Sequence, residues 1–236
     1  VLIENPSYLG FLESQAEEVR RICRENGAEF IVYADPISLG VVAPPVQYGA
    51  TIACGDFQSL GMHMQAGGGQ GGYIASSDEM RYLAEYKDLL FGVTETVKDG
   101  EYGFGEVLFD RTSYASRDEG KEFTGTSTGL WGITAAVYLS LMGPKGLQET
   151  GQTIMQMSQY AAKRLASVPG IGLRFNSPFF KEFVVNFDDS GKTVSEINEA
   201  LLGQKIFGGK DLSTDFPELG QSALYCVTET KTKDDV

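Results

Sequence analysis

The sequence predicts an α/β fold with a mostly parallel sheet, followed by a smaller α+β region. Three observations predict it. An apolar strand pattern, a helical pattern and a second apolar strand pattern occupy residues 1–34 with short connections, and this order is typical of a right-handed crossover between parallel strands. A further apolar run at 50–54 is bounded by glycine, as buried strands commonly are. Beyond residue 144, helical patterns alternate with short strand patterns.

Each element of the first half has a local signal. Apolar side chains at helical spacing indicate a helix that stops at Gly27. The strand patterns are short apolar runs that end at glycine or at Asp35 and Pro36. In chain order we expect strand 1–4, helix 11–26, strand 29–34, strand 50–54, strand 72–75 and helix 77–86.

The second half is predicted to pack helices against a small antiparallel sheet. Residues 87–128 are rich in glycine, threonine and charge, and we expect irregular structure around 110–129. Gly143 and Pro144 separate two helical patterns, because glycine closes a helix and proline follows a helix end. The later elements are expected as helix 130–141, helix 146–167, strand 173–175, strand 181–187, helix 194–202 and strand 223–228. The predicted domains are 1–143 and 144–236.

Composition excludes several classes of protein. The chain has 32 acidic and 19 basic residues, a formal net charge of −13 and no clustered basic stripe, which disfavours nucleic acid and anionic membranes as partners. No apolar stretch approaches the roughly 20 residues of a membrane span, and the first residues lack a signal-peptide pattern. Three widely spaced cysteines are typical of free thiols in a reducing compartment. We expect a cytoplasmic protein. The sequence opens inside an expected strand and ends in KTKDDV, which resembles the first turn of an unfinished helix, so we expect a fragment of a longer protein.

Polar groups follow two of the predicted buried strands. Asp35 can face a crevice at the carboxyl end of a parallel sheet, although a turn aspartate before Pro36 is the alternative. Enzymes that use pyridoxal phosphate (PLP) pair such an aspartate with the ring nitrogen of the cofactor and bind its aldehyde through a lysine. Gln58 and Ser59 follow the next strand, where that lysine is expected. They can form hydrogen bonds but no imine.

Two further groups of residues suggest binding loops. Gly67, Gly68 and Gly69 could hold a phosphate through backbone N–H groups, or form a flexible hairpin or interface loop. Arg111 and Arg117 lie in a polar segment and could bind a carboxylate or phosphate, or make local ion pairs on a solvated loop. The single histidine has no metal-ligand spacing with the cysteines. No metal site is expected.

The order of several segments resembles one family over essentially the whole chain. The segments are ADPISLG, APPVQYGATIACGDFQSLG, GGGQGG, RTSYASR, SPFFKEFVV and FPELGQSALYCVTETKTKDDV. They occur in the same order in the glycine cleavage system P proteins, which are glycine dehydrogenases (decarboxylating). The last two segments are the most specific. The chain is most similar to the C-terminal half of subunit 1 of the two-subunit form.

The resemblance implies a PLP-dependent transferase-like fold of type I, with a partial large domain and a C-terminal small domain. It implies that subunit 2 carries the cofactor lysine, whereas subunit 1 has Gln and Ser in its place, as this chain has Gln58 and Ser59. No catalytic residue is then expected here, and Asp35, Gln58 and Ser59 would line a vestigial cofactor site. The implied partners are the PLP-bearing subunit 2 and the lipoyl H protein, in an α2β2-type assembly that decarboxylates glycine oxidatively and transfers the aminomethyl group.

The resemblance also implies roles outside that site. Gly67, Gly68, Gly69, Arg111 and Arg117 become candidates for subunit interface or substrate entrance. Two departures affect these roles. Gly69 stands where the family commonly has proline, and EFTGTSTGLWG replaces a Ser-Asn-Ile-Cys-Thr-like run.

Two other functions stay open. The chain could be a degenerate scaffold or divergent paralogue of the PLP fold, which assembles with a partner and binds no substrate. It could also be a stand-alone PLP enzyme whose lysine lies elsewhere, with Lys87 and Lys121 as the candidates.

Overall fold

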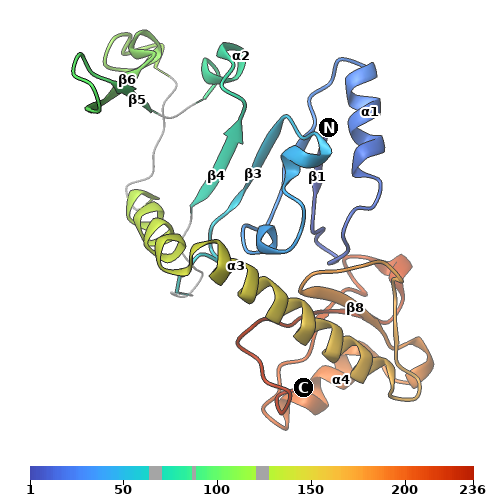
Figure 1. The fold of residues 1–236 in the computed structure, drawn as a ribbon. Coiled ribbons are helices and arrows are strands. Elements are labelled where there is room, and N and C mark those ends of the chain that lie inside the picture. The colour runs from blue at the N-terminus through green and yellow to red at the C-terminus, as the bar shows by residue number, and fades with distance from the viewer. Residues whose placement is uncertain (64–70, 87–88, 121–127) are drawn as a thin grey trace.

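A computed structural model describes residues 1–63, 71–86, 89–120 and 128–236 of the 236-residue chain. The first part is a sheet in which β1, β2 and β3 are parallel and β4 is antiparallel to β3 (Figure 1). Tyr33 pairs with both Glu4 and Cys54, so the carboxyl ends of the three parallel strands share one edge. The expected mostly parallel sheet is confirmed. Its strands are β1 (Leu2–Glu4), β2 (Ile31–Tyr33), β3 (Ile52–Asp56) and β4 (Gly72–Ser76).

The helix expected at 11–26 begins later than predicted, because α1 spans Ala16–Glu25. Phe11 instead forms an antiparallel bridge with Phe179, and the N–H of Leu12 donates to the carbonyl of Pro178 at 2.8 Å. The backbone of this segment therefore pairs with the residues that precede β8 (Glu182–Asn186), and that pairing overrides the helical spacing of its apolar side chains.

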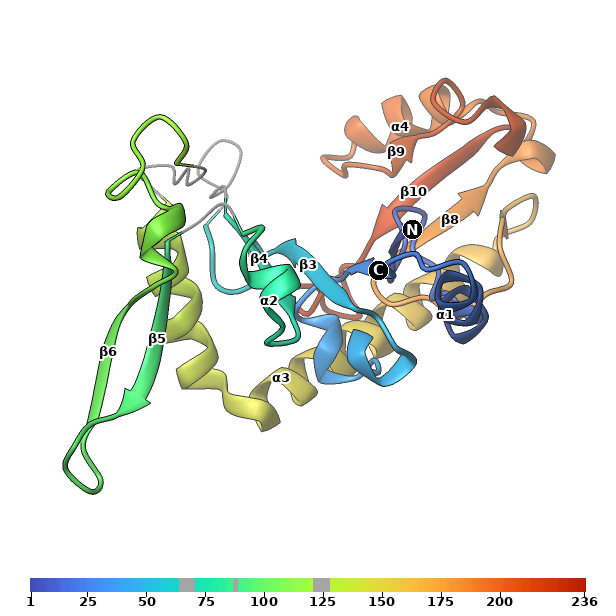
Figure 2. The ribbon, with the colours of Figure 1, turned by 90° about the horizontal axis from the view of Figure 1, so that it is seen from above.

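A β-hairpin lies within residues 87–128, where the sequence predicted no strand. It joins β5 (Leu90–Glu95) to β6 (Tyr102–Val107) and follows α2 (Met80–Leu83), which is shorter than the helix expected at 77–86. The hairpin extends away from the rest of the chain (Figure 2). Three glycines in its two strands interrupt the apolar alternation by which a strand is recognised in a sequence.

A long helix connects the two sheets. α3 spans Thr128–Ala166 and is broken at Gly143, whose φ of 61° and ψ of −178° are not helical, just before Pro144. The predicted separation of two helices at this point is confirmed. α3 packs against the 3₁₀ turn Ser38–Gly40, where a Cβ on Gly40 would lie 2.4 Å from the carbonyl oxygen of Leu147.

The C-terminal part is an antiparallel sheet in the order β7 (Gly172–Leu173), β8 (Glu182–Asn186), β10 (Ser222–Cys226) and β9 (Lys210–Asp211). It is covered by the second half of α3 and by α4 (Val194–Leu202). Ala161 and Ala162 of α3 pack on Phe183 and Val185 of β8. α4 begins at a complete capping box between Thr193 and Glu196.

One hydrophobic cluster joins the two parts of the chain. Ile37, Phe57 and Leu60 pack with Ala135 of α3 and with Phe180, which precedes β8. Because this cluster and α3 both cross the expected boundary, the division at 143 and 144 stays a prediction.

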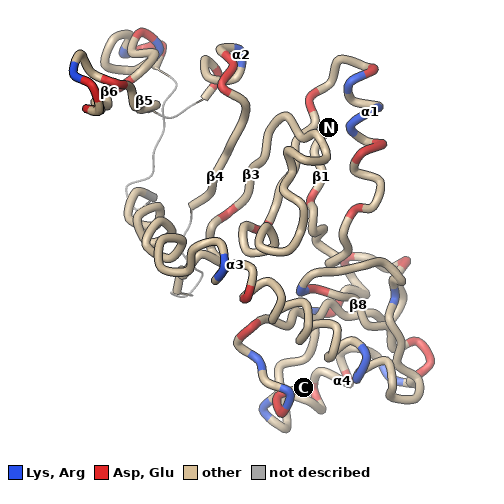
Figure 3. The backbone as a smooth tube through the Cα atoms, in the orientation of Figure 1, with Lys and Arg blue, Asp and Glu red and all other residues tan. Residues whose placement is uncertain are grey.

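Charge is spread over the surface of the described residues. Acidic and basic positions are interspersed along α1 and over the C-terminal part (Figure 3). No helix in the described ranges has both the length and the apolar character that crossing a membrane requires.

Candidate functional site

The candidate site lies where the parallel strands end. Its cavity has a volume of about 600 Å³. It is lined by the last residues of β1, β2 and β3, by residues that follow them, by Lys181 and Glu182 at the start of β8, and by Leu224 of β10. All three residues expected in a vestigial cofactor site, Asp35, Gln58 and Ser59, line it. Ser59 and Asp35 are in direct contact, because the Oγ of Ser59 donates to the Oδ1 of Asp35 at 2.9 Å.

Both oxygens of the Asp35 carboxylate are engaged. Oδ1 also accepts a hydrogen bond from the backbone N–H of Ile37 at 3.0 Å. Oδ2 accepts from the Nζ of Lys181 at 2.5 Å, in an ion pair whose side chains are only 16% and 23% exposed. A lysine from the C-terminal part of the chain thus forms an ion pair at the carboxyl edge of the parallel sheet.

Lys181 is held as an ammonium ion. Burial by itself lowers its pKa, but the attraction of Asp35 and of Glu182, whose Oε1 is 3.7 Å away, raises the pKa above its ordinary value. Burial also raises the pKa of Glu182. A protonated lysine has no lone pair, so Lys181 in this arrangement is a cation and not a nucleophile.

Lys181 is a site residue that the sequence did not reveal. In the segment SPFFKEFVV it was only the first residue of an expected strand. The available signal was a lysine directly after Phe180, which is fully buried, and before the buried run of β8. A lysine in such surroundings needs a carboxylate partner, but the sequence does not show that this partner is 146 positions away.

The side-chain amide of Gln58 donates to backbone carbonyls that follow it in the chain. Its Nε2 donates to the carbonyls of Met62 and His63, at 3.3 and 3.4 Å, while its backbone N–H donates to Asp56 at 2.9 Å. Asp56 also accepts from the hydroxyl of Tyr33 at 2.5 Å, and this bond raises the pKa of Tyr33 to about 12. The end of β3 is therefore a turn fixed by a carboxylate.

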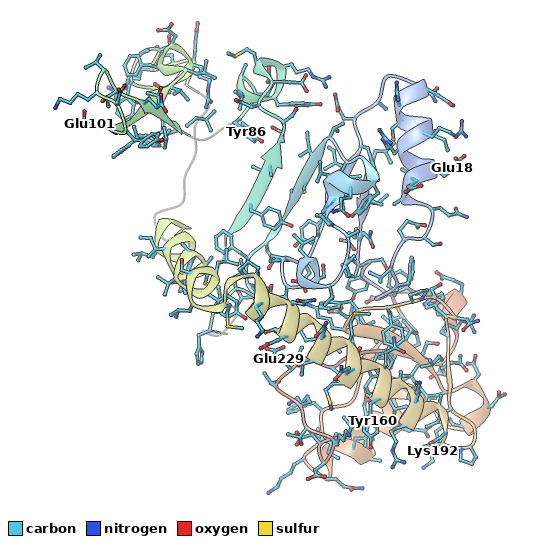
Figure 4. The ribbon with its side chains drawn as sticks, viewed as in Figure 1. Glu18, Tyr86, Glu101, Tyr160, Lys192 and Glu229 are labelled. Carbon is cyan, nitrogen blue, oxygen red and sulfur yellow. The ribbon has the colours of Figure 1, made fainter. Side chains whose placement is uncertain are left out.

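The other predicted site residues lie elsewhere. Arg111 ends the 3₁₀ turn after the hairpin and donates to the carbonyl of Tyr86, a residue beside α2 (Figure 4). Arg117 is exposed, and neither arginine lines the Asp35 cavity. Gly67, Gly68 and Gly69 fall outside the described residues. No group of three or more potential metal ligands occurs in the parts of the chain that the structure describes.

Comparison with known proteins places the chain in a family. The glycine cleavage system P-protein family matches residues 1–236. The chain belongs to this family. It is 37% identical to the probable glycine dehydrogenase (decarboxylating) subunit 1 of Staphylothermus marinus, over all of this chain and 50% of that protein. It thus spans about half the length of the curated P-protein relatives it matches.

Solved structures give the same fold. A glycine decarboxylase (P-protein) of the glycine cleavage system, in inhibitor-bound form, has a TM-score of 0.86 at 32% identity, over all of this chain and 52% of that one. A NifS-like protein from Rickettsia africae has a TM-score of 0.62 at 14% identity, over 99% and 58% of the two chains, which shows the fold alone. This P-protein chain therefore has the PLP-dependent type I fold, as expected.

The described residues around Asp35 do not fit PLP. The carboxylate that should meet the ring nitrogen is already paired with Lys181. Gln58 follows β3 where an imine-forming lysine is expected, and the remaining acidic side chains of the lining, Glu4, Asp56 and Glu182, disfavour a phosphate dianion. Lys87 and Lys121, the alternative lysines, lie outside the described residues.

Proposed function

We propose that this chain is part of an accessory subunit of glycine decarboxylase, whose partner subunit carries PLP. The observation that carries the proposal is the Asp35 cavity at the carboxyl edge of the parallel sheet, whose lining has Gln58 after β3 and Lys181 paired with the aspartate. Relatives named as glycine dehydrogenase (decarboxylating) subunit 1 support the same assignment.

In this proposal the chemistry takes place on the partner subunit. Glycine is decarboxylated there, and the aminomethyl group passes to the lipoyl arm of the H protein, which is reduced. The accessory subunit shapes the partner's site in an α2β2-type cytoplasmic assembly and is not catalytic alone. Arg111, Arg117 and the loop with Gly67, Gly68 and Gly69 are the candidates for contacts at the interface or the substrate entrance.

The test locates the imine. The full-length subunit is prepared alone and with its partner, incubated with PLP, reduced with borohydride and digested for mass spectrometry. The proposal expects the pyridoxyl label only on a lysine of the partner. A label on a lysine of the accessory subunit alone would instead support a stand-alone PLP enzyme, and the labelled peptide would show whether Lys87 or Lys121 is responsible.

A second candidate function is a scaffold with no role in catalysis. The engaged Asp35 favours it, because the carboxylate that would bind a cofactor already has a cationic partner within the chain. Variants Arg111→Gln and Arg117→Gln separate the two functions. Loss of glycine decarboxylation with an intact assembly, measured by gel filtration, supports the accessory role. Full activity of both variants supports the scaffold.

A further inference from the structure

The position of Lys181 is fixed by its neighbours along the chain. The Oγ of Ser158, which is fully buried on α3, donates to the carbonyl of Phe180 at 2.6 Å. On the other side, Gly10 has a φ of 95°, and a Cβ there would lie 1.9 Å from the carbonyl oxygen of Glu182. The backbone before and after Lys181 is therefore held between α3 and the N-terminal segment, and its side chain extends from a rigid base.

The Lys181 ammonium meets Asp35 where a cofactor ring would. In PLP enzymes an aspartate accepts a hydrogen bond from the protonated ring nitrogen. Here the Oδ2 of Asp35 accepts its hydrogen bond from Nζ of Lys181, and Oδ1 is used by Ser59 and Ile37. The carboxylate has the same chemical partner in both cases, an N–H cation, but in this chain the cation is covalently part of the protein.

Lys181 is also wrongly placed to be the imine lysine. The ring nitrogen and the aldehyde carbon of PLP are on opposite ends of the pyridine ring. An amine that contacts the aspartate lies at the nitrogen end, so it cannot reach the aldehyde of a ring bound to the same aspartate. The charge of the Lys181 ammonium leads to the same conclusion, since imine formation needs the neutral amine.

We infer that Lys181 is a built-in substitute for the cofactor's ring nitrogen, which excludes PLP from Asp35 and fastens the C-terminal sheet to the parallel sheet. This inference deepens the proposed function and rests on it for the identity of the excluded cofactor. It assigns Lys181 as a positioning residue that keeps the accessory subunit free of cofactor and holds the two sheets together.

The test measures binding of a ring-nitrogen probe to the full-length subunit without its partner. Pyridoxamine is used beside PLP, because it carries the ring nitrogen without the phosphate that the acidic lining disfavours. Lys181→Met removes the ammonium and keeps the chain length, and Lys181→Arg is the matched control that keeps the charge. Equilibrium dialysis gives the affinities, and circular dichroism shows which variants are folded.

We expect Lys181→Met to bind pyridoxamine about tenfold or more tightly than the wild type, because a charge-assisted hydrogen bond to Asp35 becomes available. Lys181→Arg should remain at the wild-type level. Adding Asp35→Asn to Lys181→Met should remove the gain. A folded Lys181→Met variant with no gain would overturn the inference, as would a gain that persists without the Asp35 carboxylate.

The inference and the proposed function fail in different ways. Suppose that the wild-type subunit binds PLP saturably, that borohydride attaches none of it to the protein, and that Asp35→Asn abolishes the binding. This outcome overturns the role of Lys181 and leaves the accessory function intact. A borohydride-fixed label on another lysine of the subunit alone overturns the accessory function instead. In that case the pyridoxamine result for Lys181→Met still decides the inference.

Discussion

Replacing Lys181 by Met should destabilise the protein by leaving Asp35 charged, partly buried and without its cation. Removing one partner of a fully buried ion pair costs about 3–5 kcal/mol. The side chains of Lys181 and Asp35 are 23% and 16% exposed, so water can solvate part of the Asp35 charge when the lysine is removed. We therefore expect a loss of about 2–3 kcal/mol in the free energy of unfolding.

The double variant Asp35→Asn with Lys181→Met should recover most of that loss. The amide oxygen that replaces the carboxylate can still accept from the N–H of Ile37, which is 3.0 Å from Oδ1 in the wild type. No charge remains at position 35, and the ion pair with the lysine that the double variant still loses is that of Glu182, at the longer distance of 3.7 Å. A coupling energy of about 1.5 kcal/mol or more between the two sites is expected for residues in direct contact. Asp35→Asn alone should cost less than Lys181→Met, because Lys181 retains Glu182 at 3.7 Å.

Two measurements on the full-length subunit check this cycle. Urea unfolding followed by circular dichroism gives the free energies, and hydrogen exchange read by mass spectrometry gives the local protection of residues 35–41 and 179–186. In Lys181→Met both peptides should exchange faster, since the ion pair joins them. A loss below about 0.5 kcal/mol, the level of an ordinary surface substitution, would refute the reasoning. A double variant as unstable as Lys181→Met would do so as well.

Three other perturbations test the surroundings of the site. Ser158→Ala should cost about 1–3 kcal/mol in urea unfolding, because it leaves the buried carbonyl of Phe180 without its donor; a neutral effect would mean that water replaces the hydroxyl. Gly40→Ala should destabilise by about 1–3 kcal/mol, as its Cβ would meet a backbone carbonyl of α3 at 2.4 Å, whereas Gly132→Ala, with nothing within 4 Å, should be neutral or stabilising. Burial raises the pKa of Glu182 above its ordinary 4.5, so its contribution to stability is complete below about pH 4.5 and is lost as pH rises through the folded-state pKa. Glu182→Gln should remove that part of the pH dependence, which urea midpoints between about pH 4 and 8 would reveal.

Several features of this P-protein chain followed from local sequence. The break at Gly143 and Pro144 was predictable because a glycine with positive φ and a following proline stop a helix whatever surrounds them. The parallel strands were predictable from short apolar runs with a helical pattern between the first two. The ordered segments from ADPISLG to the C-terminus indicated the family. Asp35 and Ser59 follow the neighbouring strands β2 and β3 and share a hydrogen bond, whereas their role in a cofactor site stays a prediction.

The tertiary structure alone decided what Asp35 contacts. Apolar periodicity indicates which side chains of an element face the interior, but not which distant segment covers them. Phe11 and Leu12 had a helical pattern but are not helical, because their backbone pairs with Phe179 and Pro178, just before β8. In the same way, the sequence pattern places Lys181 at the start of a strand, and only the fold brings it into contact with Asp35. A buried charge is stable only beside its partner, and that partner is found by the path of the chain through space.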